Sequence, residues 1–264
     1  MARKRSASAE ESTVKASSQR ENTYFEEKRR LLQAEKEAVA QFVVDNIIGE
    51  GDSILLDAGT SLFPIASEIA RKTQSSAVSK THYTIMTHNY EAFNILVDQV
   101  EGEAHVNIVL AGGRYDRDLN ALFGPQTIRA YEDFYPRVVV MGISGMVANI
   151  GLFCHGNTEE LAVKEVIFKK SELARDRIII ADHTKLGLPD ALCFGRSDRL
   201  GGAPNCRVVT GEPPEGAAEA QRRLFESERQ QLESRYGVKV EVVKVRSEGL
   251  SSSGAQEGQG ARRR

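Results

Sequence analysis

The sequence of 264 residues has no long apolar run, only three cysteines and almost no excess of charge of either sign. No stretch approaches the ~18–20 apolar residues that a membrane-spanning helix requires, and the polar N-terminus carries no secretory signal. The cysteines, Cys154, Cys193 and Cys206, are far apart and lack the spacing of metal ligands, which indicates thiols of a cytoplasmic protein. A net charge of −2 argues against a domain whose whole body binds nucleic acid electrostatically. We therefore expect a cytoplasmic globular protein that contacts no membrane.

Hydrophobic residues make up 41% of the chain and charged residues 27%, which is typical of a protein with a folded core. Residues 1–22 lack apolar periodicity and are predicted to form a disordered tail, and residues 247–264 a second one. Residues 23–246 are predicted to form one folded domain. Both tails carry short basic runs, at 3–5 and 262–264. Weak contact of these runs with nucleic acid is one hypothesis, and simple solvation of the tails is the other.

Residues 53–61, Ser-Ile-Leu-Leu-Asp-Ala-Gly-Thr-Ser, have the pattern of a buried strand that ends in a tight turn. Apolar residues at helical spacing over 62–72 predict a helix directly after it. Such a turn exposes backbone N–H groups and the positive end of a helix dipole, which together favour an anion such as phosphate. Thr60 or Ser61 could bond a phosphate oxygen and Asp57 a sugar hydroxyl. Alternatively, the glycine only tightens the turn and the serine only caps the helix.

Strands and helices alternate along the rest of the chain. Apolar runs predict strands at 84–87, 106–110, 137–142, 177–182, 207–210 and 238–245, the last at an edge of the sheet. Helical spacing predicts helices at 24–48, 91–100, 127–134, 159–170 and 217–236. This order is typical of an α/β fold with a mainly parallel sheet and helices on both faces.

Small and polar residues follow five of the predicted strands. They are Asp57, Gly59, Thr60 and Ser61 after the first, then Thr87, His88 and Asn89, then Gly112 and Gly113, then Gly142 and Ser144, and finally Asp182 and Lys185. Because ligands of parallel α/β sheets bind at the carboxyl ends of the strands, these residues predict a polar pocket along one edge of the sheet.

Eight short motifs occur in an order that resembles a known family. They are Asp-Ala-Gly-Thr-Ser at 57–61, Thr-His-Asn at 87–89, Ala-Gly-Gly at 111–113, Phe-Gly-Pro at 123–125, Gly-Ile-Ser-Gly at 142–145, Gly-Leu at 151–152, Glu-Glu-Leu-Ala-Val-Lys at 159–164 and Ala-Asp-His-Thr-Lys at 181–185. In this order they are similar to the C-terminal sensor domain of DeoR-type transcription regulators, whose fold is related to ribose-5-phosphate isomerase. The resemblance extends over roughly residues 30–245.

The resemblance implies an effector-binding regulator that takes a phosphorylated sugar or a similar anionic metabolite and forms a homo-oligomer. It places the phosphate against Gly59, Thr60 and Ser61, with glycines at 112, 113 and 142 on the pocket floor. Lys164 and Lys185 would supply positive charge. The implied ligand-binding set is Asp57, Gly59, Thr60, Ser61, Asn89, Gly112, Gly113, Gly142, Ser144, Glu159, Lys164, Asp182 and Lys185. By spacing alone, Lys164 could instead be a solvated helix lysine that pairs with Glu160.

The sequence departs from the family pattern in two respects. The residues before position 24 are too few and too polar for the family's helix-turn-helix, so no DNA-reading motif is expected in this chain. Ser144 stands where the family has an acid, and a serine has no pKa suited to the proton transfer of an isomerase. An isomerase-like enzyme using Asp57, Glu159 and Lys164 remains the alternative to a non-enzymatic sensor.

Histidines at 88, 155 and 183 fall near the predicted strand ends, but their spacing matches no zinc or iron motif. We expect no metal site and no cofactor.

Overall fold

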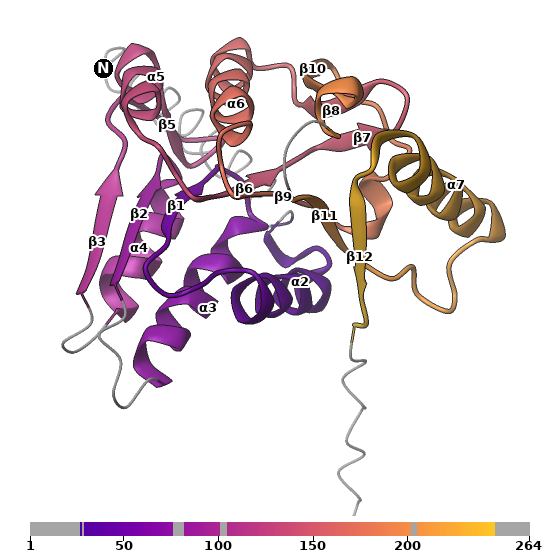
Figure 1. Cartoon of the computed structure of the whole chain (residues 1–264), viewed down its shortest axis with the longest axis horizontal. Coiled ribbons are helices and arrows are strands. Elements are labelled where there is room, and N and C mark those ends of the chain that lie inside the picture. The colour runs from indigo at the N-terminus through magenta and orange to yellow at the C-terminus, as the bar shows by residue number, and fades with distance from the viewer. Residues whose placement is uncertain (1–26, 28, 76–81, 101–104, 202–204, 246–264) are drawn as a thin grey trace, which may run out of the picture.

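The computed structural model describes residues 27, 29–75, 82–100, 105–201 and 205–245, so both predicted tails lie outside the described residues. Seven strands form one parallel sheet in the order β12-β11-β9-β6-β1-β2-β3 (Figure 1). In chain order they are β1 (Ser53–Leu56), β2 (His82–Thr87), β3 (His105–Leu110), β6 (Val138–Gly142), β9 (Asp176–Ile180), β11 (Cys206–Gly211) and β12 (Lys239–Val243). Every pairing within this sheet is parallel, which confirms the predicted α/β class.

Side chains of the central strands alternate between two buried cores because successive residues of a strand point to opposite faces. In β1, Ile54 and Leu56 belong to one core and Leu55 to the other. All three are fully buried, as expected for a strand covered on both sides.

Helices cover both faces of the sheet. The core on one face includes residues of α2 (Gln33–Asn46), α3 (Leu62–Ser75) and α4 (Tyr90–Gln99). The core on the other face includes residues of α5 (Pro125–Asp133), α6 (Thr158–Ser171) and α7 (Glu219–Tyr236). Figure 1 shows α2 and α3 on one side of the strands, and α5 and α6 on the other.

Five short strands were not predicted from the sequence. β4 (Arg114–Asp116) and β5 (Ala121–Phe123) form a hairpin, and β7 (Gly145–Val147), β8 (Gly151–Cys154) and β10 (Leu192–Arg196) form a three-stranded antiparallel sheet. Each is only three to five residues long, too short to give a clear alternation. These strands lie near the carboxyl edge of the main sheet, where the site is expected.

The prediction of one continuous helix over 24–48 is wrong in its extent. Residues 1–26 lie outside the described part, and the helical path is interrupted before α2 because Leu32 adopts a left-handed conformation with φ of 54°. Leu31, which lies within the predicted range, is 61% exposed. The other predicted helices and all predicted strands are present within a few residues of their expected bounds.

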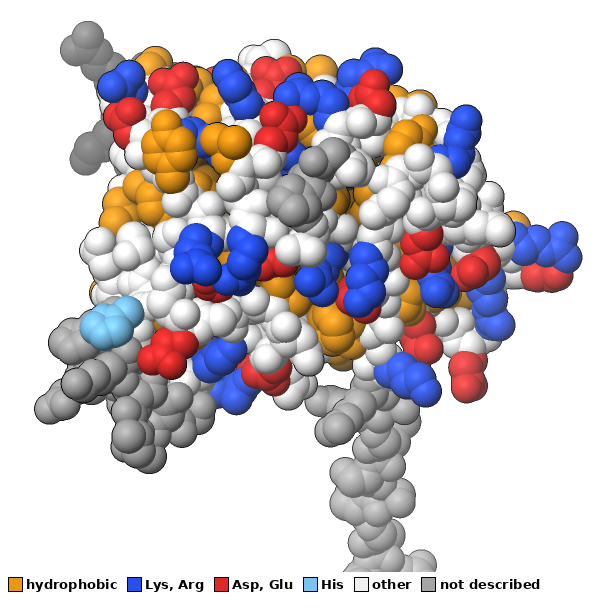
Figure 2. Space-filling model, in the orientation of Figure 1, with side chains coloured by type: hydrophobic (Ala, Val, Ile, Leu, Met, Phe, Trp, Pro, Cys, Tyr) orange, Lys and Arg blue, Asp and Glu red, His pale blue; other side chains and the backbone are white. Residues whose placement is uncertain are grey.

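The surface carries charges of both signs in close alternation. Figure 2 shows Lys and Arg side chains interspersed with Asp and Glu over the face it presents, as the near-zero net charge suggests. Within the described residues, no helix combines the length and the apolar character needed to cross a membrane.

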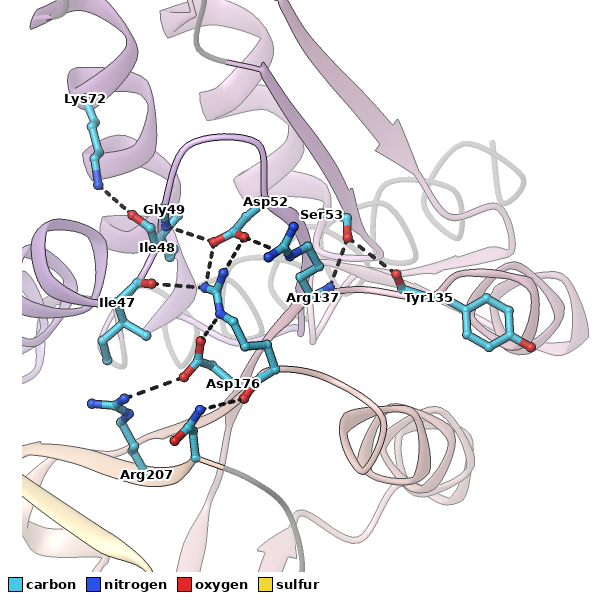
Figure 3. Close-up of polar contacts among 12 residues, drawn as sticks. Ile47, Ile48, Gly49, Asp52, Ser53, Lys72, Tyr135, Arg137, Asp176 and Arg207 are labelled. Carbon is cyan, nitrogen blue, oxygen red and sulfur yellow. Dashed lines mark hydrogen bonds and ion pairs between the residues drawn. The ribbon is translucent and has the colours of Figure 1, made fainter.

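At the amino ends of the strands, opposite the expected site, a buried carboxylate joins three segments (Figure 3). Asp52 is 1% exposed and accepts two hydrogen bonds of 2.8 Å from Arg175 and one of 2.8 Å from the N–H of Gly49. Arg137 lies 3.5 Å from the same carboxylate. The network connects the loop before β1 to the residues that precede β6 and β9, and so holds these strand starts together.

We predict that Asp52→Ala lowers the free energy of unfolding by about 2–3 kcal/mol, because it removes the acceptor of the Gly49 N–H and two of the hydrogen bonds of the Arg175 guanidinium. Arg137→Ala is the matched control. Its side chain is largely exposed, so its removal should cost at most about 0.5 kcal/mol. Urea denaturation of the three proteins measures both values. Equal losses for the two variants would contradict the assigned role of Asp52.

Candidate functional site

A buried ion pair lies where β1 and β6 end. Asp57 follows β1 and is fully buried, and Lys164 of α6 is 4% exposed. The ammonium of Lys164 lies 2.5 Å from Asp57 Oδ2 and donates at 2.8 Å to the carbonyl of Gly142. Asp57 also accepts from the N–H groups of Ala58 (2.8 Å) and Gly142 (3.1 Å). The alternative of a solvated Lys164 is therefore wrong, although Glu160 does lie 4.0 Å from it.

The protonation of Lys164 follows from its neighbours. Burial alone lowers the pKa of a lysine, but the charges of Asp57 and Glu160 outweigh it here and raise the pKa of Lys164 above its ordinary value. The ammonium also lies 5.2 Å from the centre of the Phe194 ring, which comes from β10. Lys164 is thus a permanently charged group whose charge is balanced inside the protein, unsuited to act as a nucleophilic amine.

His88, at the end of β2, lies beside this pair and is uncharged. Its Nδ1 is 2.7 Å from the hydroxyl of Tyr131, and its Nε2 is 3.9 Å from Asp57, too far for a hydrogen bond. Burial lowers the pKa of His88 to about 4, the Lys164 charge adds to this, and Asp57 opposes it. Nε2 is a buried atom with no hydrogen-bond partner among the described residues.

The turn after β1 carries the features expected of an anion site. Gly59 has φ of 118°, a conformation that favours glycine, and its carbonyl accepts at 3.2 Å from the side chain of Asn89. α3 begins at Leu62, immediately after the turn. Lys36 of α2 donates to the hydroxyl of Thr60 at 3.2 Å and brings a cation to the turn.

Asp182 and Lys185 lie at the neighbouring end of β9. Asp182 caps a short 3₁₀ helix through the N–H of Thr184, and the ammonium of Lys185 is 3.4 Å from its carboxylate. Although burial alone would raise the pKa of Asp182, the charge of Lys185 and the bonds from Thr184 lower it below its ordinary value. Ser61 and Asp182 share a small depression with Lys36.

An open cavity of about 420 Å³ lies between the β4–β5 hairpin, the start of α5 and the start of α6. Gly113 and Glu159 are among its lining residues, with Arg114, which forms an ion pair with Glu159. Gly113 has φ of 144°, and a Cβ there would lie 2.4 Å from Thr127 Oγ1. This glycine is therefore required by the close approach of β3 to α5. The preceding carbonyl, of Gly112, accepts from the same hydroxyl at 2.5 Å.

The predicted residues form three connected groups at one edge of the sheet. Asp57, Gly142 and Lys164 are in direct contact, and Gly59 contacts Asn89. Ser61 lines one depression with Asp182, which pairs with Lys185. Gly112, Gly113 and Glu159 form the wall at the β3 end. Ser144 follows Gly142, and its Oγ is a buried atom without a hydrogen-bond partner among the described residues.

Three contributors were not predicted as site residues. Lys36, His88 and Tyr131 reach the site from α2, β2 and α5, and their contacts join residues 24 to 43 positions apart. The sequence predicts His88 only as a loop histidine that hydrogen-bonds locally or to the ligand, and no local pattern marks the other two. Within the described residues, no cluster of His, Cys, Asp and Glu could hold a metal ion.

The three cysteine thiols differ in their exposure to solvent. Cys154 and Cys206 are buried and Cys193 is exposed, all three without a disulfide. Burial, reinforced by the negative charge of Glu160, raises the pKa of Cys154 to about 12, so this thiol is inert beside the ion pair.

Comparison with known proteins decides the family. The model of the DeoR C-terminal sensor domain matches residues 32–200, well over half of the chain. The chain belongs to this family. The transcriptional repressor AccR of Agrobacterium fabrum is 26% identical over 152 residues, which are 58% of this chain and 53% of the repressor. The transcriptional regulator IolR of Bacillus subtilis is 22% identical over 189 residues, 72% of this chain and 66% of the regulator. The DeoR-type chain spans about half the length of the first relatives it matches.

Solved structures similar to this DeoR-type domain include a probable sor operon regulator from Shigella flexneri. The TM-score is 0.41 at 10% identity, with 74% of this chain and 90% of that one covered. The ribose 5-phosphate isomerase of Methanocaldococcus jannaschii has a TM-score of 0.39 at 13% identity and covers 57% of this chain and 52% of its own.

The buried pair is tested by a double-mutant cycle. Lys164→Met leaves the Asp57 carboxylate buried without a cation and should lower the free energy of unfolding by about 3–5 kcal/mol. Adding Asp57→Asn removes the uncompensated charge and should recover at least about 1 kcal/mol of that loss. Chemical denaturation of the parent, both single variants and the double variant measures the coupling. Strictly additive losses would contradict direct pairing.

Because His88 is buried and neutral, we predict that the free energy of unfolding depends on pH. Its pKa in the folded protein, about 4, lies below the ~6.5 of an unfolded chain, so only the unfolded state takes up a proton between these values. The stability that neutral His88 contributes is therefore complete above pH ~6.5 and decreases by up to about 3 kcal/mol as the pH falls toward 4. His88→Gln should remove this part of the slope in urea denaturation between pH 7 and pH 4. Parallel pH curves for parent and variant would contradict a buried neutral His88.

Proposed function

We propose that this chain is a regulatory sensor module that binds a phosphorylated sugar, or a metabolite of similar charge and size, at the carboxyl edge of its sheet. The observation that carries the proposal is the buried Lys164–Asp57 pair at the strand ends, with His88 Nε2 and Ser144 Oγ as buried polar atoms that find no hydrogen-bond partner in the described part of the chain. A core that only needed to be stable would not keep such groups there, because unpaired buried polar atoms cost free energy. The relatives named as transcriptional repressors support a regulatory role.

The phosphate is proposed to bind at the turn 59–61. The first N–H groups of α3 and the positive end of its dipole suit an anion, and Lys36 supplies a nearby cation. Lys164 and Lys185 are each paired with a carboxylate. We propose that Lys36, which reaches the turn from α2, acts as a further counter-charge beside the two lysines expected from the sequence.

The remainder of the ligand is proposed to extend toward the ion pair. The hydroxyl of Ser144 and Nε2 of His88 are two of the buried polar atoms that have no hydrogen-bond partner among the described residues, and each can exchange a hydrogen bond with a sugar hydroxyl. The cavity lined by Gly113, Arg114 and Glu159 gives room at the other end. Asp57 and Lys164 then act as a fixed polar floor.

A non-enzymatic role agrees better with this chemistry than isomerisation. The Asp57 carboxylate accepts from the Lys164 ammonium and from two backbone N–H groups, so its oxygens are already engaged within the protein. Ser144 offers no acid in the position where the family has one. The relatives are named as repressors rather than enzymes.

The effector is proposed to act by favouring one arrangement of α2. This helix contributes Lys36 to the turn, and Glu35 accepts from the N–H groups of His183 (2.7 Å) and Gly211 (3.0 Å) at the ends of β9 and β11. A phosphate that draws Lys36 toward the turn would therefore change the position of α2 relative to the ends of β9 and β11. Regulation requires such a difference in affinity between two conformations. We expect the module to act in the cytoplasm, on a partner or on another copy of itself.

Calorimetry and thermal shift with a panel of sugar phosphates, the matching free sugars and inorganic phosphate test the proposal. A phosphorylated sugar should raise the melting temperature, and Lys36→Met should weaken its binding by roughly 10–100-fold, because a charge-assisted hydrogen bond is worth about 1.5–3 kcal/mol. Thr60→Val should weaken the same ligand, and Lys239→Met, a change at an exposed lysine of β12, should not.

Two results would contradict the proposal. One is the absence of any stabilisation by phosphorylated metabolites up to millimolar concentration, with the Thr60 variant behaving as the parent. The other is turnover of a pentose or hexose phosphate that Lys164→Ala abolishes, since that result would establish the isomerase alternative.

A further inference from the structure

A row of alternating charges crosses the amino edge of the main sheet, opposite the proposed effector site. This charge row consists, in order, of Arg137, Asp52, Arg175, Asp176, Arg207, Glu241 and Lys239, and each consecutive pair lies within 3.6 Å. Figure 3 shows the part from Arg137 to Arg207. Because the charge row begins and ends with a cation, its basic side chains outnumber its carboxylates.

Arg137 is an incompletely paired end of the charge row. Each inner member contacts two opposite charges, whereas Arg137 contacts only Asp52, at 3.5 Å. Within the described residues no other carboxylate forms an ion pair with Arg137, and its side chain is 62% exposed. Asp52 is already bound by Arg175 through two hydrogen bonds of 2.8 Å. Arg137 can therefore pair with a further carboxylate without giving up a short contact.

This end of the charge row borders a hollow of about 400 Å³. The charged residues that line the hollow are all basic, namely Arg137, Lys170 and Arg175. The ammonium of Lys170 lies 3.7 Å from the centre of the Tyr135 ring. Lys170 forms no ion pair with any carboxylate in the described part of the chain. Arg137 and Lys170 thus leave positive charge at the hollow that the protein does not fully balance.

Two apolar side chains form walls of the same hollow. Tyr135 is 69% exposed and Leu173 is 73% exposed, the largest exposed fractions among the large hydrophobic residues that the structure describes. Figure 3 shows the ring of Tyr135 directed away from the polar network around Asp52. Exposed apolar side chains that are rimmed by polar groups mark contact surfaces, and Tyr and Arg are enriched where partners bind most strongly.

We propose that this hollow docks an acidic segment of a partner protein, in which an aromatic or aliphatic side chain is flanked by Asp or Glu. The apolar side chain packs between Tyr135 and Leu173. The carboxylates pair with Arg137 and Lys170, so that an anion is added where the charge row ends on a cation.

The exposure of the walls favours a protein segment over a small molecule. Sites for small molecules bury roughly 70–90% of their ligand, but Tyr135, Arg137 and Leu173 are themselves more than 60% exposed. Such a shallow hollow suits a side chain that is already held on the surface of a partner. The hollow lies at the edge opposite the turn 59–61, so its test does not depend on the proposed effector.

Fluorescence anisotropy with labelled peptides tests the docking proposal on the full chain. The probes carry Glu-Phe-Glu, Glu-Leu-Glu or Glu-Trp-Glu between Gly-Ser flanks, and at least one should bind at a concentration below about 1 mM. Its analogue with Gln in place of both Glu should bind at least about tenfold more weakly, because it loses the charge-assisted contacts. The analogue with Ser in place of the apolar residue should be weakened to a similar extent, because it loses the buried apolar contact.

Variants of the chain locate the site of binding. Arg137→Gln with Lys170→Gln, and separately Leu173→Ser, should weaken the best probe at least about tenfold. Lys239→Gln is the matched control, since it removes the cation at the other end of the charge row, and it should leave the affinity unchanged. Thr60→Val, in the proposed effector site, should also bind the probe as the parent does. Circular dichroism and thermal melting verify that each variant folds.

Four results would overturn the proposal. None of the probes binds at about 1 mM; the Gln analogue binds as tightly as the acidic probe; the variants at 137, 170 and 173 bind it as the parent does; or phenylacetate alone competes as strongly as the unlabelled peptide. The last result would assign the hollow to a small organic acid instead of a protein segment.

Discussion

The contact between Lys164 and Asp57 is the constraint on which the carboxyl edge of this fold depends. It joins α6 to the end of β1 and, through Gly142, to the end of β6. Two charges taken out of water are costly unless they are paired and fully hydrogen-bonded, and such pairs often contribute little net stability. Here the pair serves mainly to hold α6 in place relative to the strands. The pair fixes the height of α6 above the strand ends and thereby the depth of the proposed pocket.

The properties of the residues around this pair depend on the same buried charges. His88 remains neutral beside a buried cation, and the β7–β8–β10 sheet closes over the ammonium with Phe194. Binding at such a site depends on shape and hydrogen bonding more than on net charge. The turn at 59–61 differs in two respects. It is only partly buried, and its nearby cation, Lys36, comes from α2. The proposed site therefore combines a buried polar floor with an anion contact at the turn, closer to solvent.

Residue patterns predicted the main sheet well and its surroundings less well. Strands such as 53–56 and 138–142 consist of apolar residues that must be buried on both faces, so their period and length are visible locally. The position of Lys164 came from the family motif, since helical spacing alone favoured a surface pairing with Glu160. Lys36 and Tyr131 were missed because their roles arise from contacts between distant segments. The break at Leu32 was missed because nothing in the surrounding helical pattern marks a left-handed leucine.

The central claim is that an anionic metabolite binds beside the turn 59–61 and the floor formed by Asp57, Gly142 and Lys164. Hydrogen–deuterium exchange with and without the sugar phosphate that stabilises the protein best tests it most directly. The account predicts slower exchange at residues 59–65 and 142–145, together with a change in the first turn of α2. Protection confined to the opposite edge, around the 400 Å³ hollow that includes Arg137 and Lys170, would contradict it.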